Sequence, residues 1–319
     1  MDRSKKKRLS SLLAAYTILF LDNMGFAVVF PIFPLLFLNH THSFLPAHTP
    51  EATRHLLLGF LIAAFPLAQF FGAPFFGDLG DRFGRKRALF FTIIGTVIGY
   101  ALSALAIFLS LFTLLLFSRL LTGFFAGNLS LAMAAIADLN VEEKARGKSM
   151  SVVAMLLGIS WILSILMGAS FSNPANSHTF YPALPLLITA LLALLSLWVL
   201  KRFYNETSPC VPEHRPHILK GLHNIIHIFE SKQLRSFYLI LFFWVFGTIL
   251  ALQWVAPVTM IKFGATQTKV MWLFLASGTG WALGSGLVNR YLDFLSKSRA
   301  PATCLQCRAI IVALWNWAA

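Results

Sequence analysis

The sequence predicts an all-α fold, a polytopic bundle of membrane helices. Of its 319 residues, 57% are hydrophobic and only 12% are charged, whereas soluble domains average about 25% charged residues. Eight apolar runs are long enough to cross a bilayer, which takes about 20 helical residues. Helices are expected because lipid cannot satisfy an open sheet edge. The runs are residues 11–38, 56–76, 88–111, 112–139, 150–171, 182–200, 237–261 and 270–288.

The positions of Lys and Arg predict the topology. These residues gather before the first run and in the second, fourth and sixth loops, and the alternate loops hold few of them. Cytoplasmic loops carry the excess of Lys and Arg, so the N-terminus is expected in the cytoplasm. This distribution explains the net charge of +14 without a basic face for nucleic acid, which we do not expect as a partner.

The long polar sixth loop predicts the division of the chain. We expect a six-helix transmembrane bundle at 1–203, a cytoplasmic linker at 204–235, and a partial bundle with an aberrant tail at 236–319. The last apolar stretch, 309–319, is shorter than the roughly 17 residues that a span needs. The second bundle is therefore expected to hold two to three helices.

Two groups of residues have the chemistry of metal ligands. No Cys or carboxylate completes a ligand set at metal spacing with the linker histidines, which a basic surface helix explains better. The cysteine pair has no second pair. We therefore predict no metal, no cofactor and, because no catalytic arrangement lies at membrane depth, no enzyme activity. The groups are His214, His217, His223 and His227, and Cys304 with Cys307.

Two ionisable residues lie deep in the predicted spans, and charges there mark functional sites. Asp22 is about 16 Å from the cytoplasmic start of the first span, and Arg119 is about 10 Å from the outer start of the fourth. In a core about 30 Å thick they share one level, so we predict an ion pair that protonation of Asp22 breaks. A static ion pair and an arginine that snorkels to the surface are the alternatives.

Residues 77–87, GDLGDRFGRKR, form a charged segment between two membrane-length runs and predict a tight cytoplasmic hairpin. The pattern G-x3-D-R-x-G-R-K resembles the signature loop of the major facilitator superfamily. The first run, with Asp22, and the later Arg119, Gly123 and Gly127 resemble its drug:proton antiporters of the tetracycline and multidrug efflux type. The resemblance implies a cytoplasmic gate in which Arg82 meets Asp138. The implied gate residues are Gly77, Asp81, Arg82, Gly84, Arg85 and Asp138.

The resemblance implies a secondary active transporter, monomeric and multi-pass in a cell inner membrane. Its partners would be the lipid bilayer, a small drug-like or amphipathic solute, and protons. Ser164 and Ile165 stand where such antiporters carry Gly-Pro, which leaves a facilitator or symporter of the same fold open. Family members have twelve helices, so the chain is expected to be C-terminally truncated. A transport-inactive remnant or a membrane interaction protein is the further alternative.

The sequence also suggests, on weaker grounds, a set of cavity-lining residues and a set of packing glycines. Polar and aromatic residues at membrane depth could line a substrate cavity, although packing explains Gln253 and Trp254 equally well. Glycines spaced along the spans predict close helix packing. The expected cavity residues are Asn23, Asn128, Gln253 and Trp254, and the packing glycines are Gly123, Gly127, Gly158, Gly168, Gly280 and Gly284.

Overall fold

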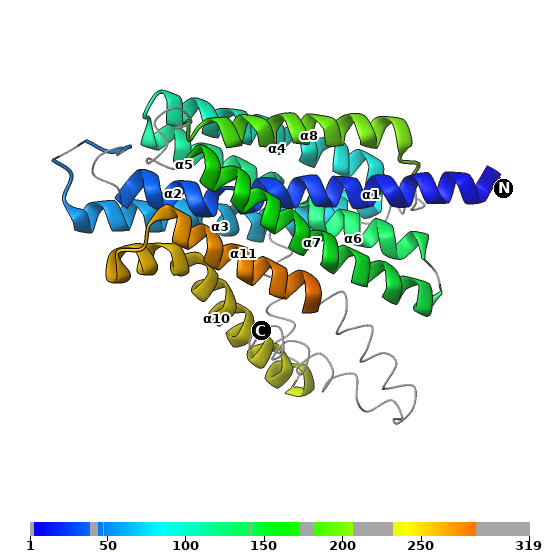
Figure 1. The fold of residues 1–319 in the computed structure, drawn as a ribbon. Coiled ribbons are helices and arrows are strands. Elements are labelled where there is room, and N and C mark those ends of the chain that lie inside the picture. The colour runs from blue at the N-terminus through cyan, green and yellow to red at the C-terminus, as the bar shows by residue number, and fades with distance from the viewer. Residues whose placement is uncertain are drawn as a thin grey trace.

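The computed structural model describes residues 3–38, 44–46, 48–140, 142–172, 181–206 and 232–284. All regular structure in these ranges is helical, which confirms the predicted fold class (Figure 1). Six helices or helix pairs are long and apolar enough to cross a membrane, and a bent pair within residues 235–263 makes a seventh. The six spans begin with α1 (Arg3–Ala27) and α2 (Val29–Leu38), followed by α3 (Glu51–Phe83), α4 (Arg85–Phe108), α5 (Phe112–Phe125) with α6 (Asn128–Leu139), α7 (Glu143–Phe171) and α8 (Leu184–Phe203).

The first span is interrupted between α1 and α2, at Val28. Pro31 explains the position of the break, because a proline has no N–H for the carbonyl four residues earlier and its ring crowds that carbonyl. That carbonyl belongs to Ala27, the last residue of α1. One turn earlier, the hydroxyl of Ser164 on α7 donates to the carbonyl of Met24. The break therefore lies against α7 inside the bundle.

The fourth span is also interrupted, at Ala126 and Gly127 between α5 and α6. The side chain of Gln69 on α3 donates through Nε2 to the Ala126 carbonyl at 3.0 Å. Non-helical backbone at membrane depth is stable only where protein or an interior cavity satisfies it. The break thus has a side-chain partner, and it places Asn128 at the first position of α6.

The charged segment 77–87 makes the tight turn between two spans that we predicted, but it is helical on both sides of Gly84 and not a loop. Helix α3 continues through Phe83, and α4 begins at Arg85, so Gly84 alone separates them. Gly84 has φ of 97°, a conformation that glycine adopts readily and other residues rarely do. The segment remains helical because the helix satisfies its own backbone groups, and one glycine supplies the whole reversal of direction.

Two further helices, α10 (Lys232–Phe263) and α11 (Gln267–Leu283), follow the linker. Helix α11 runs beside α7, whereas α10 diverges from the bundle (Figure 1). The axis of α10 bends by 45° between Ala251 and Trp254. Pro257 lies one turn later and explains the bend. Helix α8 ends at Phe203, and residues 207–231 and 285–319 lie outside the described ranges, so the predicted linker and tail remain predictions.

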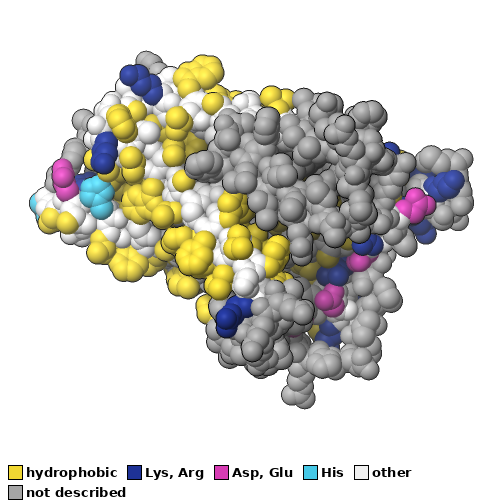
Figure 2. All heavy atoms as spheres, turned by 90° about the horizontal axis from the view of Figure 1, so that it is seen from below, with side chains coloured by type: hydrophobic (Ala, Val, Ile, Leu, Met, Phe, Trp, Pro, Cys, Tyr) yellow, Lys and Arg dark blue, Asp and Glu magenta, His cyan; other side chains and the backbone are white. Residues whose placement is uncertain are grey.

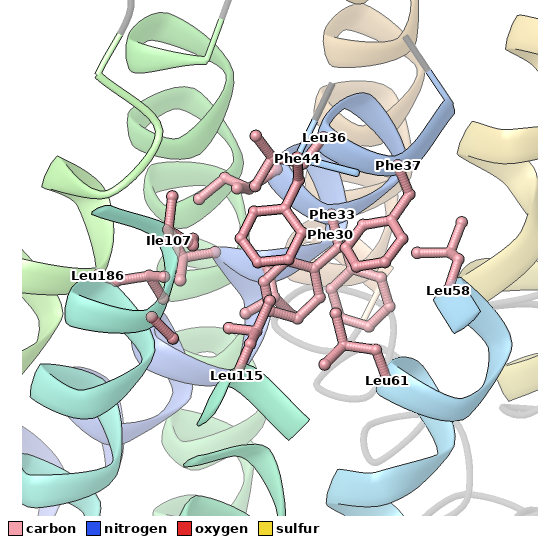
Figure 3. Packing of buried hydrophobic residues seen from close by; sticks show 14 of the residues in the cluster. Phe30, Phe33, Leu36, Phe37, Phe44, Leu58, Leu61, Ile107, Leu115 and Leu186 are labelled. Carbon is pink, nitrogen blue, oxygen red and sulfur yellow. The ribbon is translucent and has the colours of Figure 1, made fainter. Parts of the chain in front are cut away.

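Large hydrophobic side chains fill the bundle toward the end where α2 meets α3 (Figure 3). Phe37 stacks on Phe44 with ring centroids 5.5 Å apart. Beside this cluster, the buried Arg54 donates to the carbonyls of Phe37, Pro46 and Thr49 at 3.3, 2.9 and 3.1 Å. This arginine, counted in the sequence only as a loop cation, therefore ties α2 and its following loop to α3.

Many large hydrophobic side chains instead face outward. Leu67, Leu191 and Phe243 are each at least 60% exposed. Hydrophobic side chains are spread over the described part of the face seen in Figure 2. Such a surface is stable against lipid and not in water.

Glycines permit close helix contacts at several predicted positions. A Cβ on Gly123 would collide with the backbone of Phe65, and one on Gly168 would lie 2.7 Å from Pro31 Cγ. A Cβ on Gly158 would lie 2.8 Å from that of Ala282 on α11. These contacts join α3 to α5, α2 to α7, and α7 to α11. Small residues take this role because apolar side chains gain little by leaving lipid for one another.

Candidate functional site

Asp22 and Asn128 form a hydrogen bond in the interior of the bundle. Asn128 Nδ2 donates to Asp22 Oδ1 at 2.6 Å. Asn128 is fully buried, and its Oδ1 has no hydrogen-bond partner within the described structure. The break between α5 and α6 positions this amide, since Asn128 is the first residue of α6. Both atoms of the amide are therefore buried, but only one of them is satisfied.

Arg119 is buried on α5 and packs against two aromatic rings. Its Cζ lies 4.7 Å from the Phe65 ring centroid and 5.5 Å from that of Phe33. Its Nε and Nη1 have no hydrogen-bond partner among the described residues. A desolvated cation–π contact contributes about 2 kcal/mol, and each buried unpaired donor costs about 1–3 kcal/mol. The two rings therefore offset a cost of similar size, but they leave both nitrogen atoms without an acceptor among the described residues.

The predicted ion pair between Asp22 and Arg119 is absent from the described structure. The Asp22 carboxylate takes its hydrogen bond from Asn128, and Arg119 packs on Phe33 and Phe65. Counting residues gave the depth of each charge along its helix but not the direction in which its side chain leaves the helix. The prediction was wrong in its pairing.

Three cavities surround these residues. The aspartate cavity, about 160 Å³, lies at the break in the fourth span. It is lined by Leu19, Asp22, Asn23, Phe26, Phe65, Gln69, Thr96, Tyr100, Ala126 and Leu129. Asp22 is its one charged lining residue. The ring of Tyr100 packs so closely on Gly25 that a Cβ there would collide with the tyrosine hydroxyl.

The arginine cavity, about 190 Å³, adjoins the aspartate cavity and shares Phe26, Phe65 and Gln69 with it. Its wall is aromatic and aliphatic, with Arg119 as its one charged lining residue. Helices α1, α2, α3, α5, α7 and α10 all contribute. The lining residues are Phe26, Val29, Phe30, Phe33, Pro34, Ile62, Phe65, Pro66, Gln69, Arg119, Trp161 and Ile249.

The tryptophan cavity, about 220 Å³, lies between α1, α7 and α11 and includes Trp161 and Trp281. Asn23 lines both this cavity and the aspartate cavity. Its Nδ2 donates to the Leu157 carbonyl at 3.2 Å and to Ser160 Oγ at 2.6 Å. Asn23 thus fixes α1 against α7 where the two cavities meet.

The junction of α3 and α4 carries an arginine-centred ion-pair cluster. Arg85 Nη2 lies 2.7 Å from Asp81 Oδ1, and Arg85 Nε lies 3.4 Å from Asp138 Oδ2. The expected partner of Asp138 was Arg82, and this prediction is corrected. Gly84 alone turns the chain here, so Arg85 begins the next helix and points toward the end of α6.

Glu206 lies at the same end of the bundle, near Asp81, Arg85 and Asp138. We call this end the charged end. Its carboxylate accepts from the backbone N–H groups of Arg85 and Lys86 at 2.9 and 3.1 Å. An acid at a helix N-terminus satisfies free N–H donors and interacts favourably with the helix dipole. Glu206 therefore caps α4 from a position about 120 residues later in the sequence, a role that sequence reasoning missed because caps are normally local.

Neighbouring contacts complete the charged end. Lys86 Nζ donates to the Tyr204 carbonyl at 2.5 Å. The Asn205 backbone N–H donates to Ser11 Oγ at 2.9 Å, and Arg8 donates to Asn140 Oδ1 at 3.5 Å. The starts of α1 and α4 and the ends of α6 and α8 therefore meet there.

The remaining expected residues are less closely tied to the cavities. Trp254 does not line the three cavities described above. The side chain of Gln253 lies outside the described part of the structure. Gly77 lies within α3, where an added Cβ would meet nothing within 4 Å. Gly127 lies at the break of the fourth span, Gly280 in α11 and Gly284 at the end of α11. Among the described residues, no group of three metal-ligating side chains could hold a metal ion.

The broken spans, buried charges and adjoining cavities define a polytopic membrane protein with a polar site inside an aromatic interior. The model of a known family, the Major Facilitator Superfamily, matches residues 15–319. The chain belongs to this family of transporters.

Two similar proteins match part of the sequence. The class B tetracycline resistance protein of Escherichia coli is 29% identical over 198 residues, which cover 62% of this chain and 45% of that protein. Major facilitator superfamily domain-containing protein 10 of Bos taurus is 32% identical over 215 residues, which cover 62% of this chain and 44% of the relative. The matches thus span under half the length of these two relatives.

Solved structures share the fold. The human organic anion transporter MFSD10 (TETRAN) has a TM-score of 0.67 and 22% identity, covering 89% of this chain and 72% of that structure. A D-xylose-proton symporter has a TM-score of 0.66 and 18% identity, with coverage of 89% and 69%.

Proposed function

We propose that this chain moves a small amphipathic solute across a membrane by proton-coupled alternating access, with Asp22 as the proton-binding group. The observation that carries the proposal is the half-satisfied amide of Asn128 beside Asp22. An ionised Asp22 can only accept a hydrogen bond, which leaves Asn128 Oδ1 unpaired. A protonated Asp22 can also donate to that oxygen, which completes a reciprocal acid–amide pair.

The Asp22–Asn128 contact therefore differs between the two protonation states. A buried ionisable group whose hydrogen bonding changes with its proton can bias the balance between two conformations. Asn128 is the first residue of α6, at the break of the fourth span. A change in its contact with Asp22 would therefore favour a different position of α6. Discontinuous helices commonly form the sites of secondary transporters.

The charged end would be the cytoplasmic side, because it collects Lys and Arg from the N-terminus and the second loop. Arg85, with Asp81 and Asp138, would hold this end closed in one state. The likeness to tetracycline resistance proteins supports a drug-type solute, outward transport and a cell inner membrane. The resemblance to such antiporters also implies a monomer.

Passive facilitation or symport is the second candidate function. Helix α7 runs unbroken from Glu143 to Phe171, and Ser164 within it donates to the Met24 carbonyl of α1. Antiporters of the resembled type carry a Gly-Pro kink there. The likeness in fold to a D-xylose-proton symporter is compatible with this second candidate.

The test uses the 319-residue chain in proteoliposomes loaded with a pH-sensitive dye, with tetracycline as the probe. The wild type should show tetracycline-dependent proton movement and tetracycline counterflow. Asp22→Asn should abolish the proton movement and retain the counterflow, because the amide cannot release a proton. The control Glu142→Gln removes an exposed carboxylate before α7 and should behave as wild type.

Each other outcome selects an alternative. Proton movement that persists in Asp22→Asn would exclude Asp22 as the coupling group. Counterflow without proton movement in the wild type would favour the facilitator. If the wild type exchanges neither tetracycline nor the aromatic anion 1-naphthoate, the result would favour a transport-inactive membrane protein.

A further inference from the structure

We infer that the solute is an aromatic organic anion whose negative group binds Arg119 and whose ring occupies the arginine cavity. This inference rests on the proposed transport function and specifies its substrate class. It is based on the missing hydrogen-bond partners of Arg119 among the described residues and does not depend on Asp22 as the proton-binding group. Nε and Nη1 carry three of the five N–H donors of a guanidinium, and neither atom has a described partner.

The electrostatics of the cavity favour an anion. Among its described lining residues, Arg119 is the one charged side chain and none is acidic. A lone charge with low-dielectric walls focuses its field into the space that it faces and attracts the opposite charge. Asp22, the nearest acid in the neighbouring cavity, forms its hydrogen bond with Asn128. Among the described residues the cavity therefore has no fixed counter-ion, and the charge of Arg119 disfavours cations in it.

The shape and chemistry of the walls favour an aromatic body. Phe30 and Trp161 have ring centroids 5.0 Å apart, and Phe26 lies 5.3 Å from Phe65. Offset or tilted rings at these separations interact favourably, and a planar ligand can join them. A carboxylate or sulfonate on such a ligand would meet the guanidinium beside Phe65. Ligand sites of this kind combine an apolar wall with a few polar groups that fix orientation.

The test compares three probes of nearly equal shape on the purified full chain in detergent. They are 1-naphthoate, its neutral amide 1-naphthamide, and the cation 1-naphthylmethylammonium. The wild type should bind 1-naphthoate at least tenfold more tightly than the amide, and the cation most weakly. Equal binding of acid and amide, or tighter binding of the cation, would overturn the inference.

Variants locate the site. Arg119→Gln should remove the tenfold preference and leave binding of the amide unchanged, which also shows that the variant is folded. The control Arg202→Gln removes an exposed guanidinium from the end of α8 and should keep the preference. A preference that survives Arg119→Gln would overturn the inference.

A second variant keeps the test decisive if Arg119→Gln does not fold. Phe65→Leu removes a ring from the cavity wall without changing its charge, so it should weaken binding of both acid and amide several-fold. Unchanged affinity for both would overturn the inference. Arg119-dependent binding without counterflow would support the inference and contradict transport. Proton-coupled exchange of tetracycline without 1-naphthoate binding would support transport and contradict the inference.

Discussion

Asn128 Nδ2 lies 2.6 Å from Asp22 Oδ1 across the interior of the bundle, at the point where the fourth span is broken. The contact joins residues 106 positions apart in sequence. The hydrogen bond of the partly buried Asp22 therefore comes from α6, the second half of the fourth span, whereas the buried Arg119 lies on α5, its first half.

Asn128→Ala should slow proton-coupled exchange about tenfold or more. The variant removes the described hydrogen bond of Asp22, and a bond to a charged group contributes about 1.5–3 kcal/mol, where 1.4 kcal/mol corresponds to about tenfold. Proteoliposome assays with tetracycline would measure the effect. Asn140→Ala, which removes a buried amide at the charged end, is the matched control. Equal slowing in both variants would mean that Asn128 has only a structural role.

Arg85 and Asp138 should be energetically coupled, whereas Arg82 and Asp138 should not. Unfolding free energies in mixed micelles would be measured for Arg85→Gln, Asp138→Asn and the double variant. The pair is partly exposed, so the coupling should be small, about 0.5 kcal/mol. Arg82→Gln combined with Asp138→Asn should show no coupling beyond the error of the measurement. The reverse pattern would restore the partner that the sequence predicted.

Glu206→Ala should destabilise the protein through α4. Loss of a capping side chain costs about 0.5–2 kcal/mol, and Glu206→Gln should cost less because one acceptor oxygen remains. Thermal unfolding of the purified chain would measure the difference. Glu142 provides the control, because it is the residue before α7 and its side chain makes no capping hydrogen bond. If Glu142→Ala and Glu206→Ala lower the midpoint equally, the cap does not stabilise α4.

The sequence predicted the membrane class and the six spans of the first bundle, and it singled out Asp22 and Arg119 as charges inside that bundle. It did not predict their partners. The direction of a side chain from a helix depends on the breaks at Val28 and at Ala126–Gly127. Pro31 explains the first break, and a hydrogen bond from Gln69 satisfies the second. A count of residues along an apolar run predicts neither break.

The charged segment illustrates a second limit. Its composition suggested a loop. Charged residues can nevertheless lie in helix ends when they pair with one another, as Asp81 and Arg85 do on the two sides of Gly84. The contact of Glu206 could not be inferred, because nothing in the local sequence relates a residue after α8 to the first turn of α4. Such contacts require the three-dimensional arrangement.

Arg54 has a consequence for how related sequences should differ. The hydrogen bonds described for it go to main-chain carbonyls, those of Phe37, Pro46 and Thr49. Every amino acid supplies the same carbonyl, so these bonds place little restriction on the identity of the three acceptor residues. Lysine could not replace the arginine, because a compact ammonium lacks the broad planar fork of donors. Among homologues aligned with this chain, we therefore expect an invariant arginine beside a variable loop.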